Sequence, residues 1–224
     1  MKKCIITGAN RGLGLEFARQ YSEAGWQVTG TARRPDDAKE LNALKVRVLQ
    51  LDVTDAESVA ELAATLDGEP LDMLINNAGI MHILNTLPDV DVNAVAQVLD
   101  ANILGPIRVT QALLPNLAAG NAKTVVNISS GLSSIDRNTD GKFYGYRESK
   151  AALNMFTRTL GHELREQGFI VAAIDPGWVQ TDMGGQDATL TPAQSVSAMR
   201  SVIDELTVED TGTFKNSRGE IVPW

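Results

Sequence analysis

A short stretch past the middle of the chain, KFYGYRESK at positions 142–150, places two tyrosines and two charged residues at helical spacing. Tyr146 stands four residues before Lys150, and Tyr144 stands four residues before Glu148. Residues four apart share one face of a helix, so only Tyr146 would face a cation. An ammonium about 5 Å from a phenolate stabilises it by ~3 kcal/mol at an effective dielectric of about 20, which lowers a tyrosine pKa of ~10 by roughly two units. Tyr146 is therefore the candidate for proton transfer near neutral pH, whereas the anion beside Tyr144 disfavours its phenolate.

Glycines punctuate the segment CIITGANRGLG near the start of the chain, at Gly8, Gly12 and Gly14. Glycine between a strand and a helix lets the backbone approach a pyrophosphate, and the helix N-terminus supplies N–H donors. The spacing is not that of the Gly-x-Gly-x-x-Gly fingerprint, so a tight turn without a ligand is the alternative.

The elements that must position these residues alternate along the chain. Short apolar runs stand at 4–7, 27–32, 46–50, 72–76, 124–129 and 170–175. Helix-like segments stand at 12–24, 56–66, 92–116 and 145–167, followed by a further helix near 191–206 and a seventh strand near 211–215. Strands of nearly continuous apolar character are typical of parallel sheets. We therefore expect an α/β fold, a single Rossmann-like domain over 1–224 with a doubly wound parallel sheet of about seven strands flanked by helices.

The amino-acid composition makes several classes of function unexpected. Of 224 residues, 43% are hydrophobic and 21% charged, and the net charge of −8 makes nucleic acid an unexpected partner. The single cysteine, Cys4, allows no internal disulfide and fits a reducing compartment. The start lacks a signal-peptide core and no apolar run approaches membrane-spanning length, so a cytoplasmic protein without membrane contact is expected. Neither His82 nor His162 has a second His or Cys at ligand spacing, so no metal is expected.

Several motifs, in order, resemble those of the short-chain dehydrogenase/reductase family. The matching stretches are TGANRGLG at 7–14, LDV at 51–53, NNAG at 76–79, NISS at 127–130, YRESK at 146–150 and PGWVQT at 176–181. Each motif is weak alone, but together they span nearly the whole chain. TGANRGLGL, GYRESKAALNM, PGWVQTDMGG and FKNSRGEIVPW further resemble the branch that contains Sniffer-type carbonyl reductases and the bacterial developmental C-factor.

The resemblance implies roles for particular residues. The catalytic set would be Asn102, Ser130, Tyr146 and Lys150, in which Ser130 holds the substrate carbonyl oxygen and Lys150 also hydrogen-bonds the nicotinamide ribose. The cofactor-binding set would be Gly8, Asn10, Arg11, Gly12, Leu13, Gly14, Arg33, Asp52, Val53, Asn77, Ala78, Gly79, Tyr146, Lys150, Pro176, Gly177, Val179 and Thr181. The stretch between Ser130 and Tyr146 is longer than in many family members, so Ser133 is the alternative catalytic serine. Homodimers or homotetramers are common in the family.

Asn102 carries an independent hint in the segment ANILGPIRVT. Pro106 stands four residues later and cannot donate to the carbonyl of residue 102. The helix should therefore be irregular here and leave that carbonyl free for a water, which could link Lys150 to solvent as a proton relay. A kink with no such role is the alternative.

The residues after the second predicted strand bear on the choice of cofactor. NAD-preferring enzymes place Asp or Glu there for the ribose 2′-hydroxyl, but this chain has Arg33 and Arg34. Guanidinium groups suit a phosphate dianion, and by resemblance Arg11 is a further position where NADPH-preferring members are basic. NADPH is predicted over NADH, with solvated surface charge as the alternative reading of Arg33 and Arg34.

The sequence thus predicts an NADPH-dependent reduction of a small carbonyl compound (ketone, aldehyde or quinone) to an alcohol by hydride transfer. The first alternative is a signalling or regulatory protein of the C-factor type that binds NADP(H) with little turnover. An epimerase or dehydratase is a weaker alternative, because little sequence follows Pro176 to form a separate substrate domain.

Overall fold

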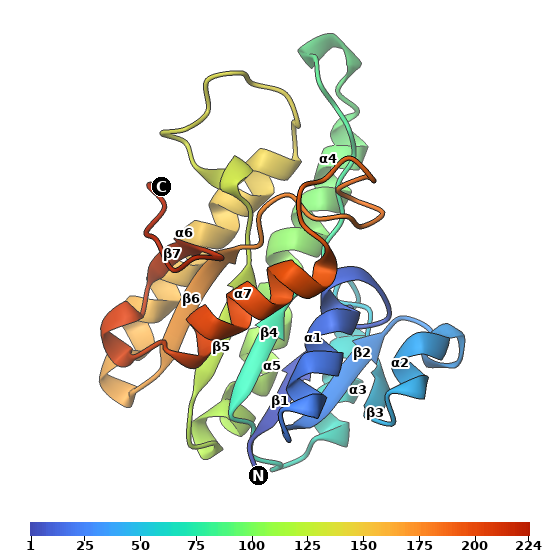
Figure 1. The fold of residues 1–224 in the computed structure, drawn as a ribbon, viewed down its shortest axis with the longest axis vertical. Helices are drawn as coiled ribbons and strands as arrows, with labels where there is room; N and C mark the ends of the chain where they lie inside the picture. The colour runs from blue at the N-terminus through green and yellow to red at the C-terminus, as the bar shows by residue number, and fades with distance from the viewer.

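The computed structural model describes residues 1–224 and has a seven-stranded, wholly parallel sheet at its centre (Figure 1). The strands are β1 (Lys3–Ile6), β2 (Gln27–Ala32), β3 (Arg47–Gln50), β4 (Met73–Asn76), β5 (Thr124–Ile128), β6 (Ile170–Asp175) and β7 (Thr213–Asn216). Their order across the sheet is β3-β2-β1-β4-β5-β6-β7. The chain therefore winds outward from β1 in one direction and then, from β4 on, in the other.

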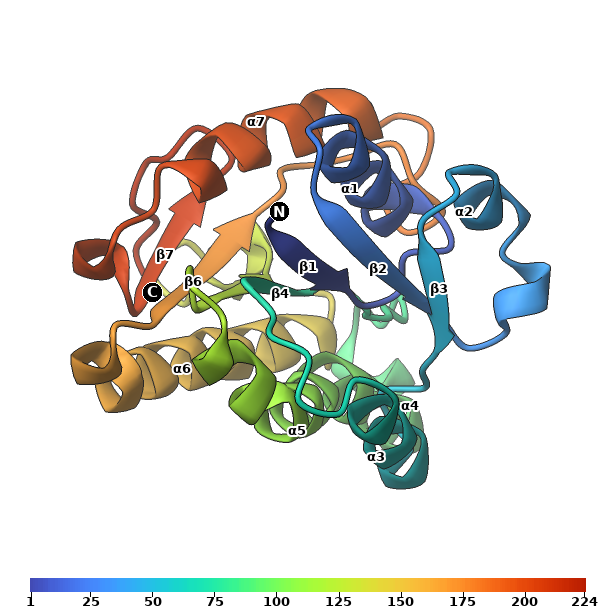
Figure 2. The ribbon, with the colours of Figure 1, turned by 90° about the horizontal axis from the view of Figure 1, so that it is seen from below.

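Helices cover both faces of the sheet (Figure 2). One layer holds α1 (Gly12–Glu23), α2 (Lys39–Ala43) and α7 (Pro192–Asp204). The other holds α3 (Ala56–Thr65), α4 (Val92–Leu99), α5 (Gly105–Ala119) and α6 (Tyr146–Leu164). The predicted doubly wound α/β fold is confirmed.

Successive strand residues face opposite layers, which explains the continuous apolar runs. Cys4 and Ile6 pack with the core beneath α1 and α7, whereas Ile5 packs with the core beneath α3, α5 and α6. Cys4 is almost completely buried, and burial raises the pKa of its thiol, so it acts as a small hydrophobic side chain.

One helical prediction needed correction, and one short helix was missed. The segment predicted as one helix over 92–116 is divided by a π turn at Asp100–Leu104, which separates α4 from α5. Helix α2 was not predicted, because five residues carry too little periodicity to detect.

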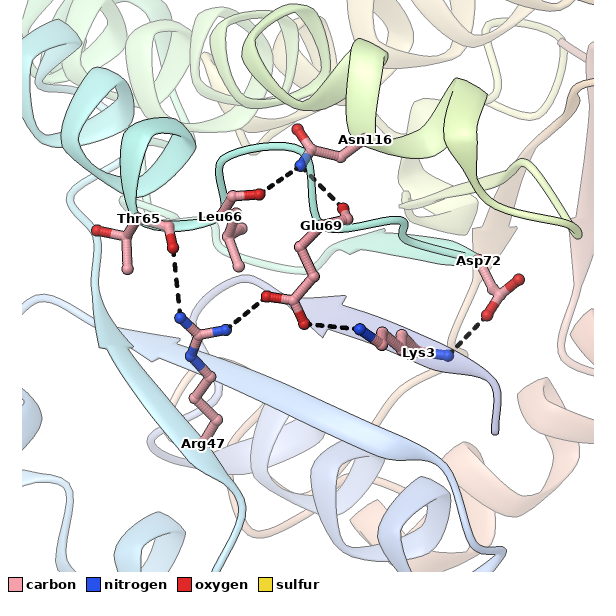
Figure 3. Close-up of polar contacts among 7 residues, drawn as sticks. All are labelled: Lys3, Arg47, Thr65, Leu66, Glu69, Asp72 and Asn116. Carbon is pink, nitrogen blue, oxygen red and sulfur yellow. Dashed lines mark hydrogen bonds and ion pairs between the residues drawn. The ribbon is translucent and has the colours of Figure 1, made fainter.

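At the amino ends of the strands, charged side chains tie the loop before β4 to its neighbours (Figure 3). Glu69 accepts from Lys3 Nζ at 3.0 Å and from Arg47 at 2.8 Å, and these bonds, led by that from Lys3, lower the pKa of its carboxyl. Asn116 on α5 donates to the carbonyls of Leu66 and Glu69. This network stabilises the amino ends of the strands. The sequence motifs gather at the opposite, carboxyl ends.

No helix combines the length and apolar character needed to cross a membrane. No group of three or more His, Cys, Asp or Glu side chains is placed to hold a metal ion.

Candidate functional site

The predicted site residues gather at the carboxyl ends of the central strands. Because the winding direction changes between β1 and β4, a crevice is expected at this point of an open parallel sheet. Three segments, 80–91, 131–145 and 176–191, rise above this edge (Figure 1). The first two are joined where Tyr144 N donates to Leu84 O at 2.9 Å.

Tyr146 and Lys150 lie in the first turns of α6, which begins directly after Gly145 at a φ of +79°. Both are buried, with 7% and 5% of their surface exposed. Lys150 Nζ lies 5.9 Å from the centre of the Tyr146 ring and donates to Ile128 O at 2.7 Å. The last residue of β5 and the first turns of α6 thus hold the ammonium beneath the phenol ring.

The prediction that Lys150 brings the pKa of Tyr146 towards neutrality was wrong for this structure. Burial raises the pKa of Tyr146 to about 12; a hydrogen bond with Ser130 lowers it and the charge of Asp175 raises it further. Burial also lowers the pKa of Lys150 from 10.5 to about 8. Burial is the largest cause of both pKa shifts, so Tyr146 is a protonated hydroxyl at neutral pH.

The two candidate serines have different surroundings. The Ser133 hydroxyl is buried, donates to Ser130 O at 2.6 Å and accepts from Asn154 Nδ2 at 2.7 Å. The Ser130 hydroxyl accepts from Leu132 N at 3.2 Å and lies near enough to Tyr146 to lower the pKa of its phenol. The Ser133 hydroxyl thus stabilises the turn through both of its hydrogen bonds, and Ser130 is the serine that lies near Tyr146.

Asn102 lies inside the π turn, and its side chain forms a clamp. Its Oδ1 accepts from Ile80 N at 2.8 Å, and its Nδ2 donates to Ile80 O at 2.8 Å and to Ser149 Oγ at 3.0 Å. These bonds link the segment after β4 to α6. The predicted helix irregularity is confirmed, and Pro106 provides no N–H for the Asn102 carbonyl.

The glycine turn is tightly packed around the end of β1. A Cβ on Gly14 would lie 2.3 Å from Gly8 O and 2.5 Å from Asn77 Nδ2, so no side chain fits there. Asn77 Nδ2 donates to the carbonyls of Thr7 and Gly8. The NNAG motif therefore holds the shape of the turn from the neighbouring strand.

Asn76 has a structural role deeper in the sheet. Its Nδ2 donates to Asn127 Oδ1 at 2.8 Å and to Thr110 Oγ1 at 3.0 Å, and Asn127 donates on to Thr157. This buried chain joins β4 and β5 to α5 and α6.

The arginines predicted to select the cofactor are not equivalent. Arg34 is paired with Asp37 at 3.1 Å, and Arg11 is paired with Asp182, both on exposed side chains. Arg33 is exposed and forms no ion pair, and its positive charge helps to lower the pKa of Asp52. Burial opposes ionisation of Asp52, but bonds from Thr54 and the charge of Arg33 lower the pKa of its carboxyl.

The remaining predicted cofactor residues lie at or just beyond the carboxyl ends of the strands. A Cβ on Gly79 would lie 3.0 Å from Asn102 Oδ1 and 3.7 Å from Lys150 Nζ, so this glycine covers the catalytic candidates. A Cβ on Gly12 would lie 3.4 Å from Thr181 Cγ2, which brings the segment after β6 against the glycine turn. Leu13 lies in the first turn of α1, and the others stand on the segments that follow the strands: Asn10, Val53, Ala78, Pro176, Gly177 and Val179.

Asp175 was missed as a site residue. It ends β6, and its Oδ2 lies 3.1 Å from where a Cβ on Gly131 would be, next to Ser130. The available signal was an acidic residue at a strand end directly before Pro-Gly, but the pairing of β5 with β6 was needed to place it near Tyr146.

The chain is similar to known proteins over most of its length. Residues 2–190 match the family model described as short chain dehydrogenase. The chain is 48% identical to C-signal of Myxococcus xanthus over 155 residues, 69% of this chain and 93% of that protein.

Two solved structures are similar over the full chain. One is the carbonyl reductase Sniffer of D. melanogaster, with a TM-score of 0.95, 32% identity and coverage of 100% of both chains. The other is an NADPH-bound carbonyl reductase from chicken fatty liver, with a TM-score of 0.93, 34% identity and coverage of 100% of this chain and 99% of that one. The chain therefore belongs to the short-chain dehydrogenase/reductase family of oxidoreductases.

Proposed function

We propose that this protein is an NADPH-dependent reductase that converts a ketone, aldehyde or quinone to the alcohol, with Tyr146 as the general acid. The observation that carries this proposal is the placement of Tyr146 above the buried Lys150, whose Nζ lies 5.9 Å from the ring centre, with the Ser130 hydroxyl near enough to lower the pKa of the phenol. The similarity to an NADPH-bound carbonyl reductase supports it.

The residues present fit a dinucleotide. Gly8 and Gly14 pack too tightly for side chains beside the start of α1, and the first N–H groups of this helix, which have no partner within it, would suit a pyrophosphate. Arg33 has no ion-pair partner and would contact a 2′-phosphate. Gly79 and Lys150 would flank the nicotinamide ribose. When bound, NADPH supplies the hydride that reaches the carbonyl carbon.

The protein's own part is to hold the carbonyl oxygen and deliver a proton to it. Ser130 and Tyr146 would donate hydrogen bonds to that oxygen, polarising the carbonyl before the hydride arrives. An alkoxide is a much stronger base than a phenolate, so a tyrosine with a pKa of about 12 gives up its proton readily to the developing alkoxide. A low pKa is thus not needed for the reductive direction.

Lys150 and Asn102 complete the proposed proton path. Lys150 would supply the proton that restores the Tyr146 hydroxyl. A pKa of about 8 makes its ammonium an effective donor near neutral pH. The Asn102 carbonyl in the π turn would hold a water between Lys150 and solvent. The Asn102 side chain only positions this carbonyl, since Ile80 and Ser149 occupy its polar atoms.

Apolar side chains around the crevice favour an apolar substrate. Each of the three segments exposes at least one: Ile83 and Leu87, Ile135, and Trp178 and Met183. Grouped exposed apolar residues commonly mark a binding surface.

A homodimer or homotetramer and a cytoplasmic location stay predictions made from the sequence.

The experiment that tests the proposal follows NADPH oxidation with a panel of aromatic and aliphatic ketones, aldehydes and quinones, and identifies the alcohol by mass. The 48% identity to C-signal favours a signalling role as the second candidate. Tight NADPH binding without turnover of any compound in the panel would favour that second candidate.

Substitution of Arg33 by serine is expected to weaken NADPH binding by about 10–100-fold and to leave NADH binding nearly unchanged, because one charge-assisted contact to phosphate is lost. Arg34→Ser is the matched control, since Arg34 is already paired with Asp37. Titration of cofactor fluorescence measures both constants. Equal losses for the two variants would contradict the special role of Arg33.

A further inference from the structure

Asp175 places a carboxylate beside the proposed reacting groups. One oxygen, Oδ1, accepts from Gly177 N at 3.0 Å, which fixes the side chain at the end of β6. The other, Oδ2, lies 3.1 Å from the position of a Cβ on Gly131, so it rests against the backbone that follows Ser130. Oδ2 has no hydrogen-bond donor in the structure, and the residue is half-buried.

The charge of Asp175 acts on the same space as the proposed substrate. Gly131 directly follows Ser130 and begins the turn that Ser130 caps, so the carboxylate lies against the turn that carries the Ser130 hydroxyl. The negative charge also reaches Tyr146, where it adds to the effect of burial and raises the pKa. No cation forms an ion pair with Asp175, so its unshared oxygen is free to meet a ligand.

We propose that Asp175 determines substrate specificity: it accepts a hydrogen bond from a hydroxyl or amino group next to the reactive carbonyl and rejects compounds with a carboxylate there. This inference rests on the proposed reductase function. Two like charges brought close together in a half-buried site repel strongly, and at an effective dielectric of about 20 the discrimination is on the order of 100-fold. A hydrogen-bond donor at the same place would satisfy the free oxygen.

A matched pair of substrates tests the inference. Methyl phenylglyoxylate and phenylglyoxylate share one ketone and differ in whether the adjacent group is a neutral ester or a carboxylate. The wild type is expected to favour the ester by about 100-fold in kcat/KM. In Asp175→Asn this preference should fall to about tenfold or less, chiefly because the KM for the acid decreases. Asparagine keeps an acceptor for Gly177 N, so the turn is preserved.

Asp187→Asn is the charge-matched control, because Asp187 is an exposed residue of the same 176–191 segment. It should keep the wild-type preference, which separates the local effect of Asp175 from a general change in net charge. NADPH affinity and melting temperature of each variant report on folding.

An unchanged ester-to-acid preference in a folded Asp175→Asn protein that still reduces the ester would overturn the inference and leave the proposed function standing. Failure of the wild type to reduce either compound or any member of the carbonyl panel would overturn the proposed function and this inference with it. A second comparison, 2-hydroxyacetophenone against acetophenone, should show a wild-type preference for the hydroxyketone that Asp175→Asn loses.

Discussion

Replacement of Lys150 by methionine is expected to reduce turnover by about 100-fold or more and, at the same time, to stabilise the folded protein at pH 7. Lys150 is buried, and the fall of its pKa from 10.5 to about 8 corresponds to about 3 kcal/mol of disfavoured charge. Methionine fills similar space without a charge. The lost hydrogen bond to Ile128 O offsets about 1 kcal/mol, which leaves a net gain of about 2 kcal/mol.

The difference in stability between Lys150→Met and the wild type should depend on pH in a definite direction. Between pH 8 and 10.5 the unfolded chain keeps the proton on Lys150 while the folded chain loses it, so wild-type stability attributable to this residue rises with pH. The gap in melting temperature between Lys150→Met and the wild type should therefore be largest near pH 7 and narrow towards pH 10.

Thermal unfolding at several pH values and NADPH oxidation measure the two effects on the same preparations. Lys2→Met is the control, because Lys2 is exposed at the amino-end edge of the sheet. A variant that is both inactive and less stable than the wild type at pH 7 would show that the buried ammonium does not destabilise the fold.

Replacement of Gly14 by alanine is expected to lower NADPH affinity by more than about 100-fold and stability by about 3 kcal/mol. The added Cβ would lie 2.3 Å from the Gly8 carbonyl oxygen, far inside the contact distance, and 2.5 Å from Asn77 Nδ2. The turn must open, which breaks the bonds that Asn77 donates to Thr7 and Gly8. The backbone surface that would face the pyrophosphate is lost with it.

Gly25→Ala is the matched control. Gly25 follows the same helix at a φ of +81° with nothing within 4 Å of an added Cβ, so the change should cost about 1 kcal/mol of stability through strain alone. Its NADPH affinity should equal that of the wild type. Calorimetry and cofactor titration compare the two variants, and normal NADPH binding by Gly14→Ala would refute the packing argument.

Much of the fold could be predicted from local sequence. The apolar runs marked six strands, and a proline four residues after Asn102 marked the irregular helix that became the π turn. The motifs at the strand ends predicted which residues would lie near one another, because the carboxyl ends of parallel strands meet at one edge of the sheet.

Features that depend on burial or on non-local pairing could not be predicted. The pKa values of Tyr146 and Lys150 reflect desolvation, which is a property of the folded environment and not of their spacing on a helix. The bond from Asn154 on α6 to the Ser133 hydroxyl, which favours Ser130 as the proposed catalytic serine, joins residues far apart in the sequence. Asp175 becomes relevant only because β6 lies beside β5.

The most direct test of the account compares NADPH oxidation by the wild type and Tyr146→Phe with the best carbonyl compound of the panel. Phenylalanine keeps the ring that packs above Lys150 and removes only the proton donor. Turnover should fall by about 10²–10⁴-fold while NADPH affinity stays within a few-fold of the wild type. Equal turnover by the two proteins would contradict the assignment of Tyr146 as the general acid.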